Sequence, residues 1–588
     1  MVSARFEGIP YPIPNSLAFL SREVHLERGN RSRISGARFI AETLKGYGIT
    51  HVFWVETILR RALMEMEAIG IRRVLTHSEK GAAYMADGYA RASGRPSVCM
   101  AQSVGAANLA AGLQDGFLGG SPVIALTGFK PPLAQYRHAY QEILHQVMFD
   151  PVTKWNVRVD TIEQLPYLLR QAFREATSGA PGPVHLDLLG FAGELIESAE
   201  ADLEVIIEES FTHSPAFRPE PDERLVEEAA RLLEAAERPV IVAGGGAITS
   251  SAGPEILSLA EGLSIPVATS LNGKGVVPDR HPLSVGIVGS YSQGCANGIV
   301  SEADLVLFIG SHAGDQETHG WTVPRPGASV IQIDIDPREL GRNYPNRVSL
   351  WGDARVTVRR LAEVVRRKAT ASGWADHAQE LIQEWRSKVE PLRQSDAIPI
   401  RPERLCKELS DFLPVDAILV ADTGFAAVWT GTMVDFTHPG QRFIRCAGSL
   451  GWAFPAALGV KCAAPERPVI CFTGDGGFWY HLSELETASR CDIRAVTVVN
   501  NNSALGQCRI LIKAAYGDQP GKWEEMTRFQ GVDFARIAEE MGCLGIRVER
   551  PGEIKGALER ALQADRPAVV EIITDPQADP APPWAPRW

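Results

Sequence analysis

Short apolar runs alternate with amphipathic stretches along most of this chain. The segment ARFIAETLKGYG (37–48) has the apolar spacing of a helix that ends at glycine, and HVFWV (51–55) predicts a buried strand. Four further runs before residue 195 predict strands, namely VLTHSE, SVCMAQS, PVIALTG and PVHLDLLG. Because strands that alternate with helices form parallel sheets covered on both faces, this part predicts an α/β domain.

The same rhythm recurs twice further along the chain. Strands are predicted first by RPVIVAGGGA, IPVATS, ADLVLFIG and SVIQIDIDP, and later by AILVADTG, PVICFTGDGG, AVTVVNNN and AVVEIITD. We therefore predict an α/β fold with three open, doubly wound, parallel-sheet domains at 34–195, 223–366 and 397–575, of which the first and third could share a topology. The remaining segments predict an N-terminal extension (1–33), a linker (196–222), a linker helix (367–396) and a proline-rich C-terminal tail (576–588).

Composition narrows the class of protein and its partners. A hydrophobic content of 45% and a charged content of 22% are typical of a soluble globular protein. The formal charge of −12, with no basic stripe, argues against nucleic acid and against an anionic membrane surface. No apolar run approaches the roughly 18 to 20 residues of a membrane span. Nine scattered cysteines without a CxxC pair favour a reducing, cytoplasmic setting.

Two predicted strand ends carry polar oxygen donors. GDGG (474–477) follows one buried run, and VTVVNNNSALG (496–506) contains another that ends in three asparagines. Asp475 and Asn502 offer the hard oxygen ligands that Mg²⁺ selects, and the bare glycines would let phosphate approach their backbone amides. The simpler alternative for GDG alone is an Asx turn after a strand.

Two other stretches are weaker candidates. VAGGGA (242–247) lies between a strand and a helical segment, but it lacks a clean GxGxxG pattern and favours a structural turn over a nucleotide contact. Glu79 lies at the start of the helix GAAYMADGYARA, where it could simply interact with the helix dipole. The small residues of that helix suggest close packing against another element.

Taken together, these stretches resemble the thiamine diphosphate-dependent enzymes of the acetohydroxyacid synthase and pyruvate decarboxylase type. The resemblance covers about residues 33–575 in the order pyrimidine-binding, central and diphosphate-binding domain, and Asp475 precedes Asn502 by 27 residues (502 − 475). It implies thiamine diphosphate and Mg²⁺ as cofactors, with Asp475, Asn502 and the carbonyl of Ala504 as metal ligands. The cofactor-binding residues implied are Glu79, Gly424, Phe425, Ala426, Leu450, Gly474, Asp475, Gly476, Gly477, Asn502, Ala504, Leu505 and Gly506.

The resemblance also implies catalytic roles. Glu79, in EKGAAYMADGYAR, corresponds to the glutamate that contacts the aminopyrimidine N1′ and promotes formation of the C2 ylide; an enamine intermediate follows. Gln141 lies where the family has phenylalanine-glutamine-glutamate, and Leu450 corresponds to the residue wedged beneath the cofactor. The active site is expected between two subunits, with the first and third domains of one chain not meeting. This implies at least a homodimer and favours a homotetramer.

The chain departs from the family pattern around the expected substrate. Glu56 and Thr57 replace a proline-glycine-glycine loop, Phe129 and Lys130 follow TG where glutamine is usual, and Leu511 replaces a tryptophan that selects the second 2-oxo acid. The central domain lacks the arginine-bearing segment that holds flavin, which argues against FAD. The polar candidates around a small carbonyl substrate are Glu56, His77, Lys130, His138, Gln141, His145 and Gln507, and we count Glu56 with Glu79 and Gln141 as catalytic.

Several functions therefore stay open. The leading hypothesis is a lyase or carboligase acting on a 2-oxo acid or related carbonyl compound. Its alternatives are an acetolactate synthase proper with flavin, a C–C bond-cleaving hydrolase, and a catalytically silent cofactor-binding subunit. An oxidoreductase built on VAGGGA would instead bind NAD.

Overall fold

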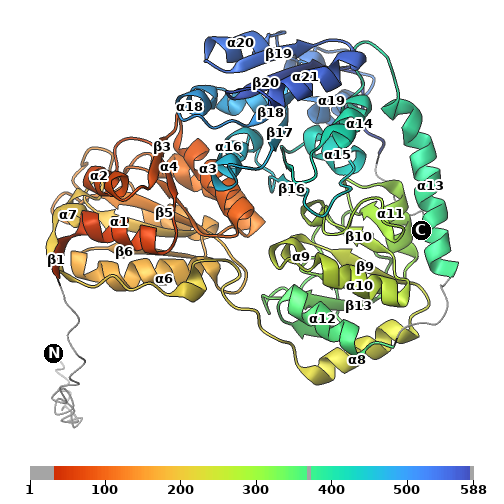
Figure 1. Ribbon diagram of the computed structural model, residues 1–588, viewed down its shortest axis with the longest axis horizontal. Helices are drawn as coiled ribbons and strands as arrows, with labels where there is room; N and C mark the ends of the chain where they lie inside the picture. The colour runs from red at the N-terminus through yellow and green to blue at the C-terminus, as the bar shows by residue number, and fades with distance from the viewer. Residues whose placement is uncertain (1–31, 367–372, 583–588) are drawn as a thin grey trace, which may run out of the picture.

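The computed structural model describes residues 32–366 and 373–582, and it contains three α/β domains (Figure 1). Each domain has a six-stranded parallel sheet with helices packed on it, as the strand-helix alternation predicted. The predicted N-terminal extension lies almost wholly outside the described residues. So do residues 367–372 of the predicted linker helix and the last six residues of the tail.

The first domain has the strand order β3-β2-β4-β5-β7-β6. Its strands are β2 His51–Trp54, β3 Arg72–Leu75, β4 Ser97–Met100, β5 Val123–Phe129, β6 Trp155–Val159 and β7 Val184–Leu189. Its helices are α1 Gly36–Gly46, α2 Arg60–Ala68, α3 Glu79–Ser93, α4 Ala106–Gly119, α5 His145–Phe149, α6 Leu165–Thr177 and α7 Glu194–Ser198. The predicted linker is not irregular throughout, because β8 (Glu200–Leu203) lies within it and pairs antiparallel with β1 (Ser32–Ser35).

The central domain has the order β11-β10-β9-β12-β13-β14. Its strands are β9 Pro239–Ala243, β10 Val267–Thr269, β11 Ser284–Ile287, β12 Leu305–Ile309, β13 Ser329–Asp334 and β14 Val348–Trp351. Its helices are α8 Glu223–Ala235, α9 Gly245–Thr249, α10 Gly253–Leu263, α11 Gly294–Glu302 and α12 Ala354–Val364. The long helix α13 (Gly373–Arg393) then runs along the outside of the molecule toward the third domain (Figure 1).

The third domain has the order β16-β15-β17-β18-β20-β19, which repeats the topology of the first. Its strands are β15 Ile418–Ala421, β16 Arg442–Arg445, β17 Val469–Gly474, β18 Val496–Asn501, β19 Leu544–Val548 and β20 Ala568–Ile573. Its helices are α14 Pro402–Phe412, α15 Phe425–Met433, α16 Ala453–Ala463, α17 Asp475–Phe478, α18 Glu484–Arg490, α19 Gly506–Tyr516, α20 Phe534–Glu540 and α21 Ile554–Leu562.

Helices α3 and α16 join the first and third domains of the same chain, so the expectation that these domains do not meet is wrong. Helix α3 starts after Ser78, whose hydroxyl accepts from the amide of Gly81. A Cβ on Gly88 would lie 2.1 Å from the carbonyl oxygen of Ala456, and one on Gly459 would lie 1.9 Å from that of Met85. The small residues of α3 therefore allow the backbones of two domains to touch, and one apolar core continues across them.

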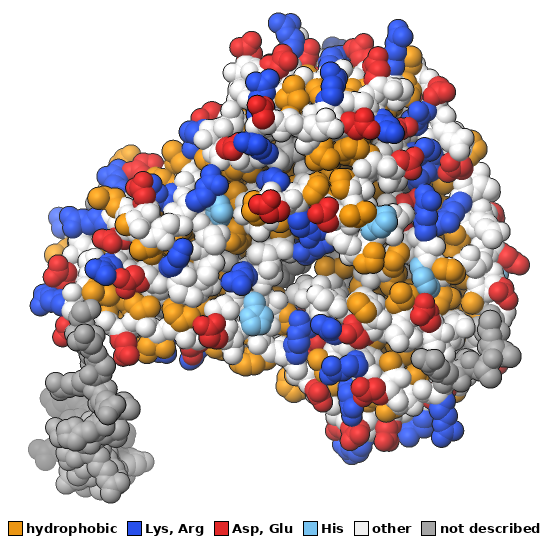
Figure 2. All heavy atoms as spheres, in the orientation of Figure 1, with side chains coloured by type: hydrophobic (Ala, Val, Ile, Leu, Met, Phe, Trp, Pro, Cys, Tyr) orange, Lys and Arg blue, Asp and Glu red, His pale blue; other side chains and the backbone are white. Residues whose placement is uncertain are grey.

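The surface of the molecule carries charged side chains of both signs. Figure 2 shows acidic and basic side chains interspersed over one face, so the net negative charge is not gathered in a single patch there. Among the described residues, no helix combines the length and the apolar character needed to cross a membrane.

Candidate functional site

Three neighbouring strands of the third sheet end at the candidate site. β15 leads to Gly424, β17 ends at Gly474 before Asp475, and β18 ends at Asn501 before Asn502. β17 pairs with both β15 and β18, so the three carboxyl ends lie side by side. The strand order reverses between β15 and β17, and ligands of open α/β sheets bind at such a switch point.

Asp475 is the buried acid of this edge. Its side chain is nearly inaccessible to water, and its Oδ2 atom has no hydrogen-bond partner within the described residues. Burial raises the pKa of Asp475 to about 7, although backbone hydrogen bonds involving Asn502 and Ala504 act in the opposite direction. A buried carboxylate oxygen without a partner is costly, and a bound cation would compensate it.

The two asparagines after β18 point to different partners. The Asn501 amide donates to the buried carboxylate of Glu571 at 2.6 Å and its oxygen accepts from the Ser503 amide, so this side chain supports the loop from beneath. The Asn502 oxygen lies 3.1 Å from the amide of Ala504, on the loop that also contacts Asp475. The structure therefore brings Asp475, Asn502 and Ala504 together, as the predicted metal-ligand set requires.

The glycines at this edge leave room above the backbone. A Cβ on Gly474 would meet no atom within 4 Å, so open space lies beside it. Gly424 has a φ of +65°, which favours glycine, and it begins the turn into α15. Gly476 and Gly506 instead pack closely against Leu505 and Phe425 respectively. Among the predicted cofactor-binding glycines, Gly474 therefore borders open space, whereas Gly476 and Gly506 are packed against neighbouring side chains.

Asp422 is a site residue that the sequence reasoning missed. It is buried directly after β15, and burial raises its pKa to about 6. Its carboxylate accepts from the backbone amides of Thr423 and Gly451 and from the hydroxyl of Thr473. Since Gly451 follows the half-buried Leu450, Asp422 fixes the segment that carries the predicted wedge residue. The DTG sequence after a buried strand, similar to GDG, was the signal that could have identified it.

Gln507 links the third domain to the central domain. Its side-chain nitrogen donates to the hydroxyl of Tyr291 at 2.7 Å. Its Oε1 atom lies on the side of Gly424, 3.1 Å from where a Cβ of that residue would be. Gln507 is therefore the one among the predicted polar candidates that the structure places directly at the edge formed by β15, β17 and β18.

Glu79 lies in the first domain, at the start of α3. Its carboxylate accepts from the Asn108 amide at 3.1 Å and is packed against Gly105 at the start of α4. The preceding residues face α18 of the same chain, since His77 is paired with Glu486 at 2.8 Å. The side chain of His77 therefore forms a contact between the first and third domains. Among the described residues, the contacts of Glu79 involve its own domain and none of the strand ends at Asp475.

The other first-domain candidates gather at the carboxyl edge of the first sheet. Glu56 follows β2, is exposed and forms an ion pair with Arg60. Lys130 follows β5, and its ammonium lies 4.1 Å from the ring of Phe191, with no acidic partner within the described residues. Gln141 has a φ of +59°, and its side-chain oxygen is buried without a partner in the described part of the chain.

The two histidines of the neighbouring segment differ in environment. His138 is exposed, whereas His145 is completely buried and bonded to the carboxylate of Asp187. His145 therefore faces the interior of the first domain and not a substrate.

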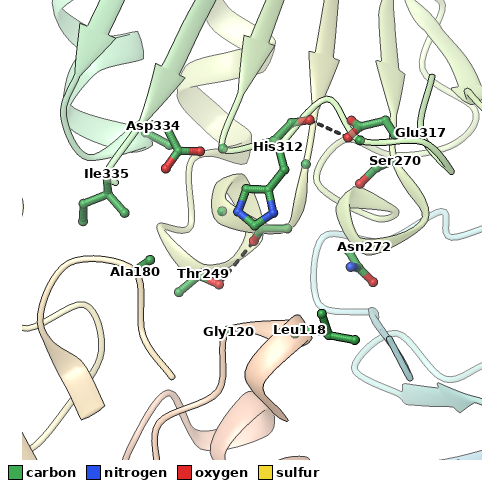
Figure 3. A pocket seen from close by; sticks show the side chains of 18 of the residues that line it. Leu118, Gly120, Ala180, Thr249, Ser270, Asn272, His312, Glu317, Asp334 and Ile335 are labelled. Carbon is green, nitrogen blue, oxygen red and sulfur yellow. Dashed lines mark hydrogen bonds between the residues drawn. The ribbon is translucent and has the colours of Figure 1, made fainter. Parts of the chain in front are cut away.

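A cavity of about 370 Å³ lies between the central and first domains. Figure 3 shows His312 projecting into it between Asp334 and Thr249, with Leu118, Gly120 and Ala180 of the first domain opposite. The VAGGGA turn forms one wall. Gly244 must be glycine for packing, because its Cβ would lie 2.3 Å from the carbonyl oxygen of Gly310.

Acidic side chains outnumber basic ones among the charged residues that line this cavity. Burial raises the pKa of Glu317 to about 7, and its Oε2 accepts from Ser311 at 2.5 Å. Burial also raises the pKa of Asp334 to about 6. The one arginine of the lining, Arg445, donates to Gln316. An anionic ligand would thus find few positive charges here.

Comparison with known proteins matches all three domains. The family model for the thiamine pyrophosphate enzyme N-terminal TPP binding domain matches residues 34–149, that for the central domain 226–361, and that for the C-terminal TPP binding domain 422–572. The chain is 35% identical to a probable acetolactate synthase large subunit of Methanocaldococcus jannaschii, with 92% of both chains covered. It is 31% identical to the acetolactate synthase isozyme 2 large subunit of Escherichia coli, with 92% of this chain and 96% of the other covered. It is 32% identical to the acetolactate synthase large subunit of Corynebacterium glutamicum, with 96% and 90% covered.

Proposed function

Because this chain belongs to the thiamine pyrophosphate enzyme family, we propose that it is a thiamine diphosphate- and Mg²⁺-dependent lyase or carboligase. Its substrate would be a 2-oxo acid or a related carbonyl compound. The observation that carries the proposal is the buried Oδ2 of Asp475, which has no hydrogen-bond partner among the residues that the structure describes and lies beside the Asn502–Ala504 loop at the switch point of the third sheet. A carboxylate oxygen that is unsatisfied at the switch point of such a sheet lies where a ligand of the sheet would bind.

The residues present fit the proposed cofactor pair. Asp475, the side-chain oxygen of Asn502 and the carbonyl of Ala504 would hold Mg²⁺, because they are hard oxygen donors on two adjacent strand ends. The open space beside Gly474 and the turn at Gly424 would accept the diphosphate against bare backbone. Mg²⁺ would lower the pKa of Asp475 again, so that its carboxylate is ionised where the cation needs it.

When bound, thiamine diphosphate supplies a nucleophilic carbon that adds to a carbonyl group. Glu79 would hold a proton against the aminopyrimidine N1′ and thereby promote deprotonation at that carbon. Asp422 would keep Gly451 in place, so that Leu450 supports the cofactor in a fixed conformation. Gln141 and Glu56, together with Lys130, would face the substrate from the carboxyl edge of the first sheet.

A second copy of the chain would complete the site. Glu79 lies in the first domain and makes its contacts there, whereas the proposed metal ligands lie in the third. Large apolar side chains are exposed on the loop after β5, on α5 and on α19: Leu133 (88%), Tyr136 (85%) and Tyr140 (76%) on the loop, Val147 (74%) on α5 and Leu511 (69%) on α19. Because such surfaces are usually covered by a partner, they support a homodimer, and a homotetramer is compatible with them.

The reaction type separates the remaining alternatives. The relatives named acetolactate synthase support a carboligase that joins two 2-oxo acids. Leu511 in place of the expected tryptophan supports a second substrate different from that of an acetolactate synthase. The acidic residues that line the central cavity argue against flavin. A C–C bond-cleaving hydrolase would use the same cofactor-binding residues, whereas a catalytically silent subunit would not need Glu79.

The test is turnover by the full chain loaded with Mg²⁺ and thiamine diphosphate. A panel of 2-oxo acids would be assayed for CO₂ release, and the products would be identified by mass, with pyruvate alone and pyruvate with a second 2-oxo acid as separate arms. CO₂ release with a coupled product supports the carboligase. Release with only an aldehyde supports a decarboxylase. No release from any substrate, with the cofactor bound, would exclude both.

A further inference from the structure

A buried histidine–aspartate pair lies beneath the carboxyl edge of the first sheet. His145, in α5, and Asp187, in β7, are both completely inaccessible to water. The Nε2 of His145 lies 2.8 Å from the carbonyl oxygen of Ser103, and its Nδ1 lies 2.9 Å from Oδ1 of Asp187. A carbonyl oxygen only accepts, so Nε2 must carry a hydrogen and donate it to Ser103.

The other side of the imidazole needs a second proton. Oδ1 of Asp187 already accepts from the hydroxyl of Thr127 at 2.7 Å. If Nδ1 of His145 and this oxygen were both unprotonated, two acceptors would face each other without water. One proton must therefore lie between them, on either atom. The pair is neutral as a whole, and the orientation of the ring is fixed from both sides.

The neighbouring histidine does not compete for this role. His185 contacts the hydroxyl of Thr127 at 2.6 Å and stacks on Phe149 with ring centroids 3.6 Å apart. Burial lowers the pKa of His185 to about 3, so this ring is neutral. The charged and titratable groups around His145 are thus Asp187 from β7 and the neutral His185.

Ser103 connects the pair to Gln141. While its carbonyl accepts from His145, its hydroxyl donates to the carbonyl of Gln141 at 2.5 Å. Gln141 has a φ of +59°, a left-handed conformation that costs free energy for any residue with a Cβ. Its backbone stays there only because its surroundings hold it, and the Ser103 hydroxyl is one of those constraints.

We infer that His145 is the positioning residue for Gln141: it fixes Ser103, and Ser103 holds the strained backbone from which Gln141 faces the substrate. The value of this arrangement for catalysis rests on the proposed function, which assigns Gln141 to the site. The claim that His145 and Ser103 hold the backbone of Gln141 in place rests only on hydrogen bonds within the chain. It predicts that the loop of residues 131–144 loses order when the bond from position 145 to Ser103 is lost.

Two polar substitutions of His145 separate this role from simple filling of space. In His145→Gln, the longer amide reaches the position of Nε2 and can still donate to Ser103. In His145→Asn, the shorter amide reaches only the position of Nδ1 and loses that bond. Phe149→Leu, in the same buried helix, is the control for a loss of core packing.

The readout is limited trypsin digestion of the full chain without cofactor, followed by mass spectrometry. Arg137 is exposed in the loop, and cleavage after it would be compared with cleavage after Lys522, which is exposed in the third domain. We expect His145→Asn to accelerate cleavage after Arg137, relative to Lys522, by about tenfold or more, because cleavage follows local opening. His145→Gln and Phe149→Leu should stay within about threefold of the wild type.

The outcomes decide the inference in either direction. Equal cleavage after Arg137 in His145→Asn and His145→Gln would overturn it, as would wild-type cleavage in His145→Asn. Should both variants prove too unstable to digest selectively, Ser103→Ala must give the same acceleration, since it removes the hydroxyl that holds Gln141, and its failure to do so would equally refute the role. Digestion needs neither cofactor nor substrate, so an inactive enzyme would leave this result unchanged.

Discussion

The carboxylate of Asp422 accepts a hydrogen bond from the backbone amide of Gly451, with 3.1 Å between Oδ1 and the nitrogen. This contact connects the end of β15 to the segment that carries Leu450. It gives a structural role to a buried acid that forms no ion pair within residues 32–366 and 373–582.

Replacing Asp422 by alanine should weaken cofactor binding. The substitution leaves the partly buried amide of Thr423 and the buried amide of Gly451 without this acceptor, and an unsatisfied buried amide costs about 1–3 kcal/mol. We expect the dissociation constant for thiamine diphosphate, measured by titration calorimetry in excess Mg²⁺, to rise by about tenfold or more. Asp422→Asn keeps an acceptor oxygen, so its affinity for thiamine diphosphate should fall by less. An unchanged affinity in both variants would show that this contact does not support the cofactor.

The cofactor-free protein should lose stability with rising pH through Asp475. Its pKa is about 7 in the folded chain, against an ordinary value near 3.8, so the folded state binds this proton more tightly than the unfolded chain does. The stability it contributes is fully present below about pH 4 and is lost as the pH rises to about 7, by up to about 4 kcal/mol. Urea unfolding at several pH values, with Asp475→Asn as the reference, measures this difference.

Binding of the cofactor should abolish that pH dependence. With Mg²⁺ and thiamine diphosphate bound, the cation compensates the charge of the carboxylate. The difference in unfolding free energy between the wild type and Asp475→Asn should then no longer change with pH as it does without the cofactor. If the wild type and the variant lost stability in parallel without the cofactor, the assignment of Asp475 as the titrating group would be wrong.

Glu79→Gln should reduce turnover without a matching decrease in the affinity for thiamine diphosphate. The amide cannot serve as the carboxylate that holds a proton at the aminopyrimidine, and proton transfer of this kind contributes about 10²- to 10⁴-fold. We expect kcat to fall within that range while the dissociation constant for thiamine diphosphate changes by less than about tenfold. Asn108→Ala, which removes the partner of Glu79 but keeps the carboxylate, should have a much smaller effect. A Glu79→Gln enzyme with wild-type kcat would contradict the proposed mechanism.

Gly88→Ala should destabilise the contact between the first and third domains. Its Cβ would lie 2.1 Å from the carbonyl oxygen of Ala456, so α3 and α16 would have to separate. Overpacking of this kind typically costs about 1–3 kcal/mol, which should appear as a lower midpoint in urea unfolding. Gly556→Ala, in the exposed part of α21 with no atom within 4 Å of the new Cβ, is the matched control and should be neutral or slightly stabilising. Equal effects of the two substitutions would show that the helix contact is not tight.

The sequence predicted the interior strands of all three sheets but not most of their edges. Within the three six-stranded sheets, every strand without a prediction lies at an edge: β6 in the first sheet, β11 and β14 in the central one, and β16 and β19 in the third. An interior strand is covered on both faces and by two neighbours, so its apolar run is continuous. An edge strand such as β6, half-buried over most of its length, lacks that local pattern and is defined by its pairing with β7.

The sequence by itself determined which residues follow the buried strands. Strand propensity and apolar runs are local, so the positions of Asp475, Asn502 and the nearby glycines after buried strands could be derived from neighbouring residues alone. Only the tertiary structure decided which of these side chains face one another. Asn501 turned toward Glu571 and Asn502 toward the loop that contacts Asp475, and His145 turned inward to Asp187. These choices depend on burial and on hydrogen bonds between residues distant in sequence, which no local pattern encodes.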